Sequence, residues 1–202
     1  MEVCVRFRKY GLGALLILLL GVVLMNQPRP RKSAYLVLDP GHGGRDPGAV
    51  DPNSGTRESD LNLAQALTLK EYLVALGYTV GFTRTTDVFV PLAERTRMAQ
   101  AQGARVFVSV HHDTPTAPGP GVYYSSHPLS RNLAERIAAV LRGAWVRPSS
   151  ASRFGRLYID DFPGPAVLVE FGPTRPVSRE ERIARAQTVA SPIASYVQEV
   201  LV

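Results

Sequence analysis

The sequence of 202 residues contains one cysteine, four histidines, no internal repeat and no low-complexity tract. The single cysteine, Cys4, excludes an internal disulfide framework and any zinc site that is built from several cysteines. Hydrophobic residues make up 45% of the chain and charged residues 20%, which argues against a disordered chain, a collagen-like chain and a polytopic membrane protein. The length corresponds to about one domain, since domains average roughly 150 residues.

The folded part of the chain has little excess charge of either sign. The net charge is +6, but residues 1–32 contain six basic residues and one acidic residue. The rest of the chain has 17 basic and 16 acidic residues. A nucleic-acid-binding surface needs basic residues clustered on a folded face, so we predict no nucleic-acid partner.

The N-terminal segment has the pattern of an export signal. Residues 11–25 contain no charged or polar side chain, and three basic residues precede them. This apolar run is shorter than the roughly 20 residues that cross a bilayer as a helix, and no small-residue cleavage site follows Met25. We predict a signal peptide or membrane anchor over residues 1–25 and favour the uncleaved anchor. Residues 26–33 contain two prolines and three basic residues and are predicted to be a linker.

From residue 34 onward, apolar runs alternate with segments of helical periodicity. The predicted strands cover 34–39, 78–83, 105–111, 121–124 and 165–170, and the predicted helices cover 60–76, 91–102, 130–141 and a last segment that begins at Ser178. Ser178 and Glu181 form a capping box there, and Pro192 predicts a kink or break further along. This alternation predicts one α/β domain over residues 34–202, with a mostly parallel central sheet covered by helices on both faces.

Ionisable residues stand at the ends of three predicted strands. The first strand runs into Asp39 and His42, the third ends in His111 and His112, and the last ends in Glu170. If these strands are parallel, their carboxyl ends meet at one edge of the sheet, where ligands bind in such folds. Two histidines and a carboxylate with an open fourth position make a catalytic zinc site, and a second carboxylate would serve as general base.

Several motifs resemble those of a known family of cell-wall enzymes. They are the run Asp-Pro-Gly-His-Gly-Gly-Arg-Asp-Pro-Gly-Ala at 39–49, Glu-x-x-Leu-Asn-Leu from Glu58, Thr-Arg-Thr-Thr-Asp at 83–87, the segment from Leu92 to Arg95, Ser-Val-His-His-Asp at 109–113 and Ala-Val-Leu-Val-Glu at 166–170. In this order they resemble the motifs of the zinc-dependent N-acetylmuramoyl-L-alanine amidases, over nearly all of the predicted domain.

The resemblance implies a hydrolase that cleaves the amide between N-acetylmuramic acid and L-alanine in peptidoglycan. It implies that one zinc ion is bound by His42, Glu58 and His111, and that Glu170 is the catalytic carboxylate. Zinc would lower the pKa of its water toward about 7, and Glu170 would take the proton and return it to the leaving amine. Together with the export signal, the resemblance predicts a location in the cell envelope, periplasmic or extracytoplasmic, with the N-terminal segment as the contact to the membrane.

Two departures from the family pattern leave alternatives open. His112 occupies a position where a small residue is common, so it rivals His111 as a ligand, although strand alternation allows only one of them and the motif spacing favours His111. After Glu170 the chain has Phe-Gly-Pro-Thr-Arg at 171–175, where the family often has Gly-Phe-x-Ser-Asn, so the substrate preference is open. Two other functions also remain: a non-hydrolytic peptidoglycan-binding domain, and a zinc peptidase that acts on another amide of the stem peptide.

Other polar and aromatic residues have less specific interpretations. Arg84 and Arg95 are expected to be structural ion-pair partners, and His127 is expected at the surface. Trp145 and the tyrosine pair at 123–124 are expected to be packing residues rather than sugar-stacking residues.

Overall fold

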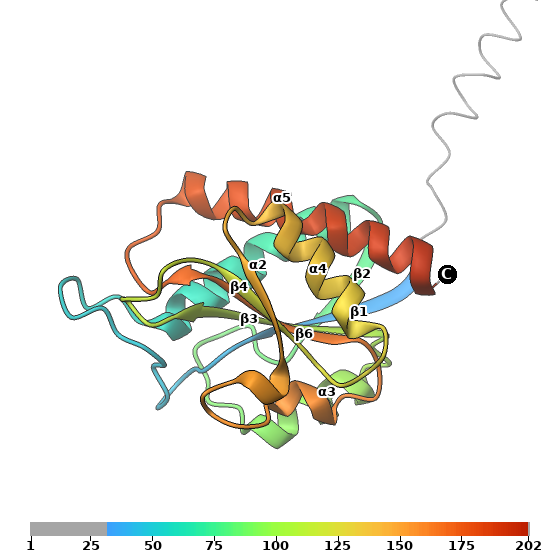
Figure 1. Cartoon of the computed structure of the whole chain (residues 1–202), viewed down its shortest axis with the longest axis horizontal. Helices are drawn as coiled ribbons and strands as arrows, with labels where there is room; N and C mark the ends of the chain where they lie inside the picture. The colour runs from blue at the N-terminus through green and yellow to red at the C-terminus, as the bar shows by residue number, and fades with distance from the viewer. Residues whose placement is uncertain (1–31, 202) are drawn as a thin grey trace, which may run out of the picture. The chain divides into compact units, whose positions relative to one another are not determined.

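The computed structural model describes residues 32–201 (Figure 1). The predicted signal peptide or anchor and most of the predicted linker lie outside these residues. Within residues 32–201, no helix combines the length and the apolar character needed to cross a membrane.

The described residues form a six-stranded sheet with helices packed against it. The strands are β1 (Lys32–Pro40), β2 (Tyr78–Phe82), β3 (Val106–Asp113), β4 (Gly121–Tyr124), β5 (Trp145–Pro148) and β6 (Ala166–Pro173). The helices are α2 (Glu58–Ala75), α3 (Leu92–Ala101), α4 (Ser130–Val140) and α5 (Arg179–Tyr196), with shorter helical turns η1 (Ser149–Ala151), η2 (Tyr158–Asp161) and η3 (Val197–Leu201).

The strand order in the sheet is β2-β1-β3-β6-β4-β5. The four strands β2, β1, β3 and β6 are mutually parallel, whereas β4 runs antiparallel to β6 and β5 runs parallel to β4. The prediction of one α/β domain with a mostly parallel central sheet is therefore confirmed.

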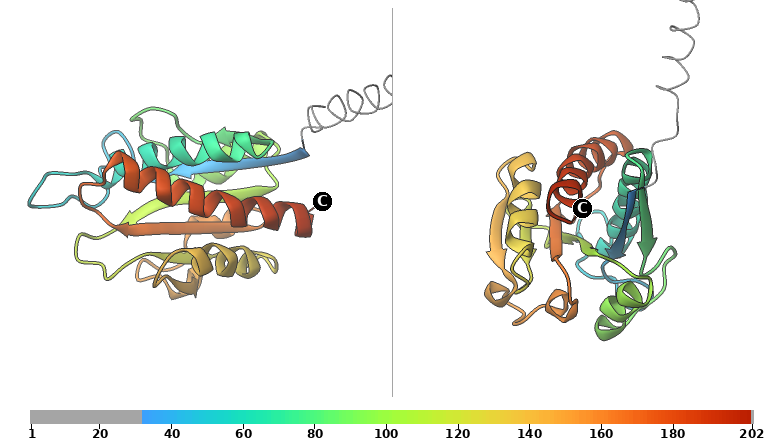
Figure 2. Two further views of the ribbon diagram at one scale, coloured as in Figure 1. Left: turned by 90° about the horizontal axis from the view of Figure 1, so that it is seen from above. Right: turned by 90° about the vertical axis from the view of Figure 1, so that its right-hand side faces the viewer.

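Helices cover both faces of this sheet (Figure 2). On one face, α2, α4 and α5 bury apolar side chains against the strands, among them Leu36, Val108, Leu69, Leu133 and Ile193. On the other face, α3 and η2 contribute Ala99 and Ile159 to a smaller core with Val37, Phe107 and Leu168. Because β1 and β3 lie between two cores, they read as nearly continuous apolar runs, which is typical of buried parallel strands.

Two features of the chain differ from the sequence predictions. Strand β5 was not predicted, because it is a four-residue strand at the sheet edge with no clear alternation of apolar and polar residues. Of the kink or break predicted at Pro192, the break is wrong, because α5 continues through this residue to Tyr196. Proline removes one backbone hydrogen bond there, but Ile193 and Tyr196 are completely buried against the sheet and hold the helix in place.

The predicted cap is confirmed, since the Ser178 side chain accepts a hydrogen bond from the Glu181 amide.

Candidate metal centre

The carboxyl ends of three neighbouring parallel strands bring the ionisable residues together. His42 lies two residues beyond β1, and His111 and Glu170 are register partners in β3 and β6. Glu58 is the first residue of α2, which begins beside the same edge of the sheet. The expectation that parallel strands would gather these residues at one edge is confirmed.

His42, Glu58 and His111 form a compact group of metal-binding side chains. One ligand atom from each residue lies within 4.8 Å of the others. The Oε1 atom of Glu58 is 3.2 Å from Nε2 of His42 and 2.9 Å from Nδ1 of His111. Burial alone would raise the pKa of Glu58, but the two imidazoles hold this pKa well below its usual value. Two imidazole nitrogens and one carboxylate oxygen are a donor set of catalytic zinc sites, so these residues fit zinc.

The loop after β1 holds His42 in an unusual backbone conformation. His42 has φ 60°, the only positive φ of a non-glycine residue within residues 32–201. Such a conformation costs on the order of 1–3 kcal/mol and persists only where neighbouring groups fix it. Asp46 Oδ2 lies 2.8 Å from Nδ1 of His42, and Arg95 donates a hydrogen bond to the His42 carbonyl at 2.9 Å. With a proton on Nδ1 facing Asp46, the Nε2 lone pair faces Glu58 and is free for a metal.

Two glycines of this loop pack directly against the side chains of the candidate ligands. A Cβ atom on Gly41 would lie 2.2 Å from Cε1 and Nε2 of His111. A Cβ atom on Gly48, which has φ +65°, would lie 2.6 Å from Oε2 of Glu58 and 2.7 Å from Cδ2 of His42. Both positions therefore require glycine because the backbone itself packs against the imidazole and carboxylate groups.

A buried polar cluster supports the loop from beneath. Asp39 is completely buried and pairs with Arg95, which is 1% exposed, at 2.9 Å. Burial alone would raise the pKa of Asp39, but Arg95 and the hydrogen bonds from Thr83 and Tyr158 hold it below its usual value. Arg84 donates hydrogen bonds to the carbonyls of Pro40, Gly41 and Ser59. Arg95 is therefore the structural ion-pair partner that the sequence predicted, whereas Arg84 is structural through backbone carbonyls.

Tyr158 also belongs to this cluster, although the sequence does not predict it. Its hydroxyl donates to Asp39 Oδ2 at 2.5 Å, lies 2.6 Å from Ser109 Oγ and lies 3.5 Å from Nε2 of His111. Tyr158 comes from η2, far from these residues in the chain, and no local pattern marks it.

His112 lies apart from the metal-binding group. Its Nδ1 is 2.9 Å from Oδ1 of Asn62, and its Nε2 is 3.4 Å from the Arg185 guanidinium. Burial and the positive charge of Arg185 lower the pKa of His112 to about 3. The structure thus brings His111, and not His112, into the group with His42 and Glu58.

Glu170 has a buried carboxylate oxygen without a partner. Within the part of the chain that the structure describes, Oε2 of Glu170 makes no hydrogen bond. Burial, together with the negative charges of Glu58 and Asp113, raises the pKa of Glu170 well above its usual value. An unpaired buried polar atom costs about 1–3 kcal/mol, so its presence beside a candidate metal centre indicates a group that meets a ligand or a proton there.

The remaining residues singled out in the sequence lie outside this centre. His127 is partly buried, and its Nδ1 accepts a hydrogen bond from the Leu129 amide at 3.3 Å. Tyr123 and Trp145 pack edge to face, with their ring centroids 4.7 Å apart, as expected for packing residues.

Comparisons with known proteins point to one enzyme family. Residues 36–199 match the family described as N-acetylmuramoyl-L-alanine amidase. The chain is 50% identical over 98 residues to N-acetylmuramoyl-L-alanine amidase AmiC of Neisseria meningitidis, covering 47% of this chain and 23% of the relative. It is 36% identical over 122 residues to AmiA of Escherichia coli, covering 55% of this chain and 42% of the relative. The aligned parts are therefore less than half the length of these two relatives.

Solved structures of similar proteins have the same fold. N-acetylmuramoyl-L-alanine amidase AmiC2 of Nostoc punctiforme superposes with a TM-score of 0.71 and 29% identity, over 82% of this chain and 98% of that chain. An N-acetylmuramoyl-L-alanine amidase from Clostridium difficile superposes with a TM-score of 0.74 over 83% of this chain and 98% of that chain. The second protein is 23% identical and supports the fold alone.

Proposed function

Because the chain belongs to the N-acetylmuramoyl-L-alanine amidase family, we propose that it is a zinc-dependent hydrolase of peptidoglycan. The amide that it cleaves joins N-acetylmuramic acid to L-alanine of the stem peptide. One observation carries this proposal: His42, Glu58 and His111 converge within 4.8 Å beside the Glu170 carboxyl group, whose buried Oε2 has no hydrogen-bond partner among the described residues.

His42, Glu58 and His111 would hold one zinc ion. When bound, zinc supplies Lewis acidity, which polarises a carbonyl group and makes water more acidic. Glu58 accepts hydrogen bonds from the Ala49 amide through Oε2 and from the Asn62 side chain through Oε1, so its orientation is fixed before any metal arrives. Asp46 fixes the ring of His42 in the same way.

Glu170 would be the residue that moves protons. Its carboxyl group lies on the strand next to His111, and burial raises its pKa well above the usual value. General acid–base catalysis is most effective when the pKa of the catalytic group is close to the working pH. Glu170 would take a proton from the attacking water and return it to the L-alanine nitrogen as the amide bond breaks.

This function requires export, because peptidoglycan lies outside the cytoplasmic membrane. Residues 1–25, outside the described part of the chain, would serve as signal peptide or membrane anchor. The cell envelope is accordingly the proposed location.

The test uses the full chain, freed of metal by a chelator and supplied with one equivalent of zinc. It digests purified peptidoglycan, and the newly exposed amino termini are labelled and identified. Zinc-dependent release of stem peptide with an L-alanine terminus supports the proposal. Zinc binding without a new amine indicates a peptidoglycan-binding domain, and a terminus other than L-alanine indicates a peptidase.

A further inference from the structure

Two arginines lie over aromatic rings close to Glu170. The guanidinium carbon of Arg147 is 4.8 Å from the ring centroid of Trp145, and that of Arg153 is 4.8 Å from the ring centroid of Phe154. Trp145 is the register partner of Gly121, which is in turn the register partner of Glu170. Neither arginine takes part in the metal centre or in the proton transfer described above.

The packing around Trp145 indicates that this ring supports Arg147 rather than binding a sugar. A Cβ atom on Gly121 would lie 2.0 Å from Cε2 of the indole, so the ring lies directly against the backbone of β4. Tyr123 contacts the ring edge to face, and Arg147 lies over it. These three groups cover part of the indole, which is half-buried, whereas Arg147 above it is exposed to solvent.

Among the described residues, neither guanidinium is held in a close ion pair, so each can bind a further anion. Arg147 makes no salt bridge within residues 32–201. Arg153, whose side chain is 58% exposed, has one ion-pair contact in the same range, to Asp113 at 3.4 Å. An exposed contact of that length contributes little free energy, so a ligand carboxylate can replace it.

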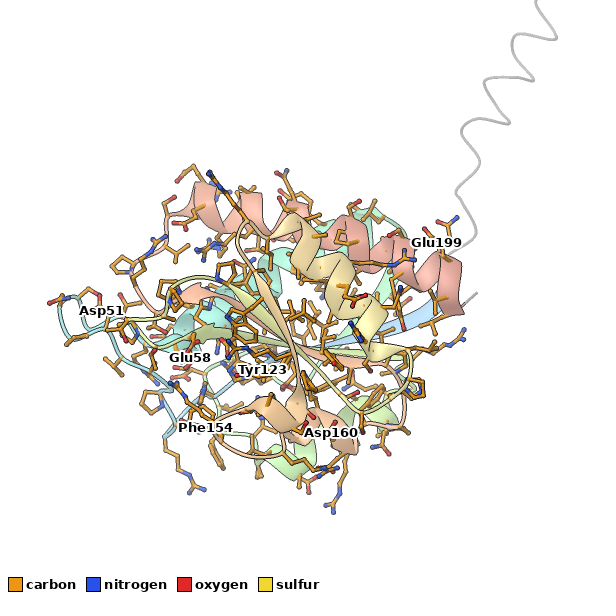
Figure 3. All side chains as sticks on the ribbon, viewed as in Figure 1. Asp51, Glu58, Tyr123, Phe154, Asp160 and Glu199 are labelled. Carbon is orange, nitrogen blue, oxygen red and sulfur yellow. The ribbon has the colours of Figure 1, made fainter. Side chains whose placement is uncertain are left out.

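The two arginines lie in the same region of the structure as Glu170. The pKa of Tyr123 is raised by burial and by the charges of Glu170 and Asp113, and lowered by those of Arg147 and Arg153. The strand registers place the two arginines on either side of Glu170 along β6. Arg153 pairs with Asp113, the register partner of Pro173, and Arg147 is the register partner of Tyr123, which pairs with Leu168. Figure 3 labels Tyr123 and the exposed Phe154.

We propose that the stem peptide extends from the amide beside Glu170 across this region. Arg147 and Arg153 then bind one of its carboxylates and make the site selective for substrates with a free acid next to L-alanine. This proposal rests on the proposed function, because the position of the peptide follows from the position of the cleaved amide. The planar guanidinium matches a carboxylate with two hydrogen bonds, and an arginine already held on an aromatic ring loses less entropy on binding. The acidic residue that follows L-alanine in the stem peptide offers such a carboxylate, whereas unmodified sugar hydroxyl and acetamido groups are neutral.

The experiment measures binding of two synthetic peptides to the zinc-loaded full chain by titration calorimetry. One is L-alanyl-γ-D-glutamyl-L-lysine amide with a free glutamate carboxylate, and the other carries an amide at that carboxylate. The variants are Arg147→Gln and Arg153→Gln. The matched control is Arg142→Gln, which changes an exposed arginine that follows α4.

We expect the wild-type protein to bind the free acid about tenfold more tightly than the amidated peptide. In each of the two variants, the affinities for the two peptides should become nearly equal, whereas Arg142→Gln should keep the wild-type preference for the free acid. Equal binding of both peptides by the wild type, or an unchanged ratio in both variants, would overturn the proposal. The peptidoglycan digest tests the proposed function separately, since binding selectivity does not depend on turnover.

Discussion

His111 and Glu170 are direct partners in the parallel register of β3 and β6. One is a candidate metal ligand, and the other has an unpaired carboxylate oxygen among the described residues. Because the two residues are anchored in adjacent central strands, the hydrogen-bond ladder of the sheet sets the spacing between them. The chemistry proposed for this site therefore depends on rigid elements rather than on loops alone.

Glu170→Gln should separate metal binding from hydrolysis. The substitution removes the group that takes the proton but keeps the shape of the side chain and all three candidate ligands. We expect zinc content close to that of the wild type and a loss of amide hydrolysis of about 100-fold or more. Metal analysis and the rate of amine release from peptidoglycan provide the measurements, and wild-type activity in this variant would remove Glu170 from the mechanism.

The two adjacent histidines should respond differently to alanine substitution. His111→Ala removes a nitrogen 2.9 Å from Glu58, so we expect zinc affinity to fall by at least about 100-fold. His112→Ala leaves the metal-binding group intact and removes a buried contact to Asn62, so we expect lower stability with zinc retained. Zinc affinity is measured by competition with a chromophoric chelator, and loss of zinc in the second variant alone would reverse the assignment.

Gly41→Ala should disturb the metal centre through His111. The added methyl group would lie 2.2 Å from the imidazole, so either the ring or the loop has to move. We expect a loss of stability of about 1–3 kcal/mol together with weaker zinc binding. Gly119→Ala is the matched control, because nothing lies within 4 Å of its added Cβ and neither glycine has a positive φ. Equal behaviour of the two variants in thermal unfolding and zinc titration would contradict the contact.

The edge of the sheet that carries the site could be predicted because its residues follow strands directly. Asp39, His111 and Glu170 each stand at or near the end of an apolar run, and parallel strands have to bring such ends together. Tyr158 could not be predicted in this way. It reaches Asp39 across 119 residues of sequence, and only the packing of η2 against the sheet creates that contact.

Local patterns also failed where tertiary packing decided the outcome. Pro192 would disrupt an isolated helix, but in α5 its neighbours Ile193 and Tyr196 are held in the core. Strand β5 has four residues and depends on β4 for its hydrogen bonds, so its sequence alone carries too little signal.

Thr83→Val tests the buried cluster beneath the site through the pH dependence of stability. The Thr83 hydroxyl donates a hydrogen bond to Asp39, whose pKa lies below its usual value in the folded protein. A carboxyl group with a lowered folded pKa stabilises the fold above its unfolded pKa of about 4, and this contribution is lost as the pH falls toward the folded value.

Removing the hydroxyl should therefore cost about 1.5–3 kcal/mol at pH 7, because a hydrogen bond to an ionised group is lost. The cost should shrink as the pH falls below about 4 toward the lowered folded pKa, because protonation of Asp39 removes the charge to which Thr83 donates. Denaturant unfolding at pH 7 and pH 3 measures the difference, and Thr79→Val, an exposed change in β2, serves as the control. An equal loss at both pH values would show that Thr83 acts through packing and not through the Asp39 carboxylate.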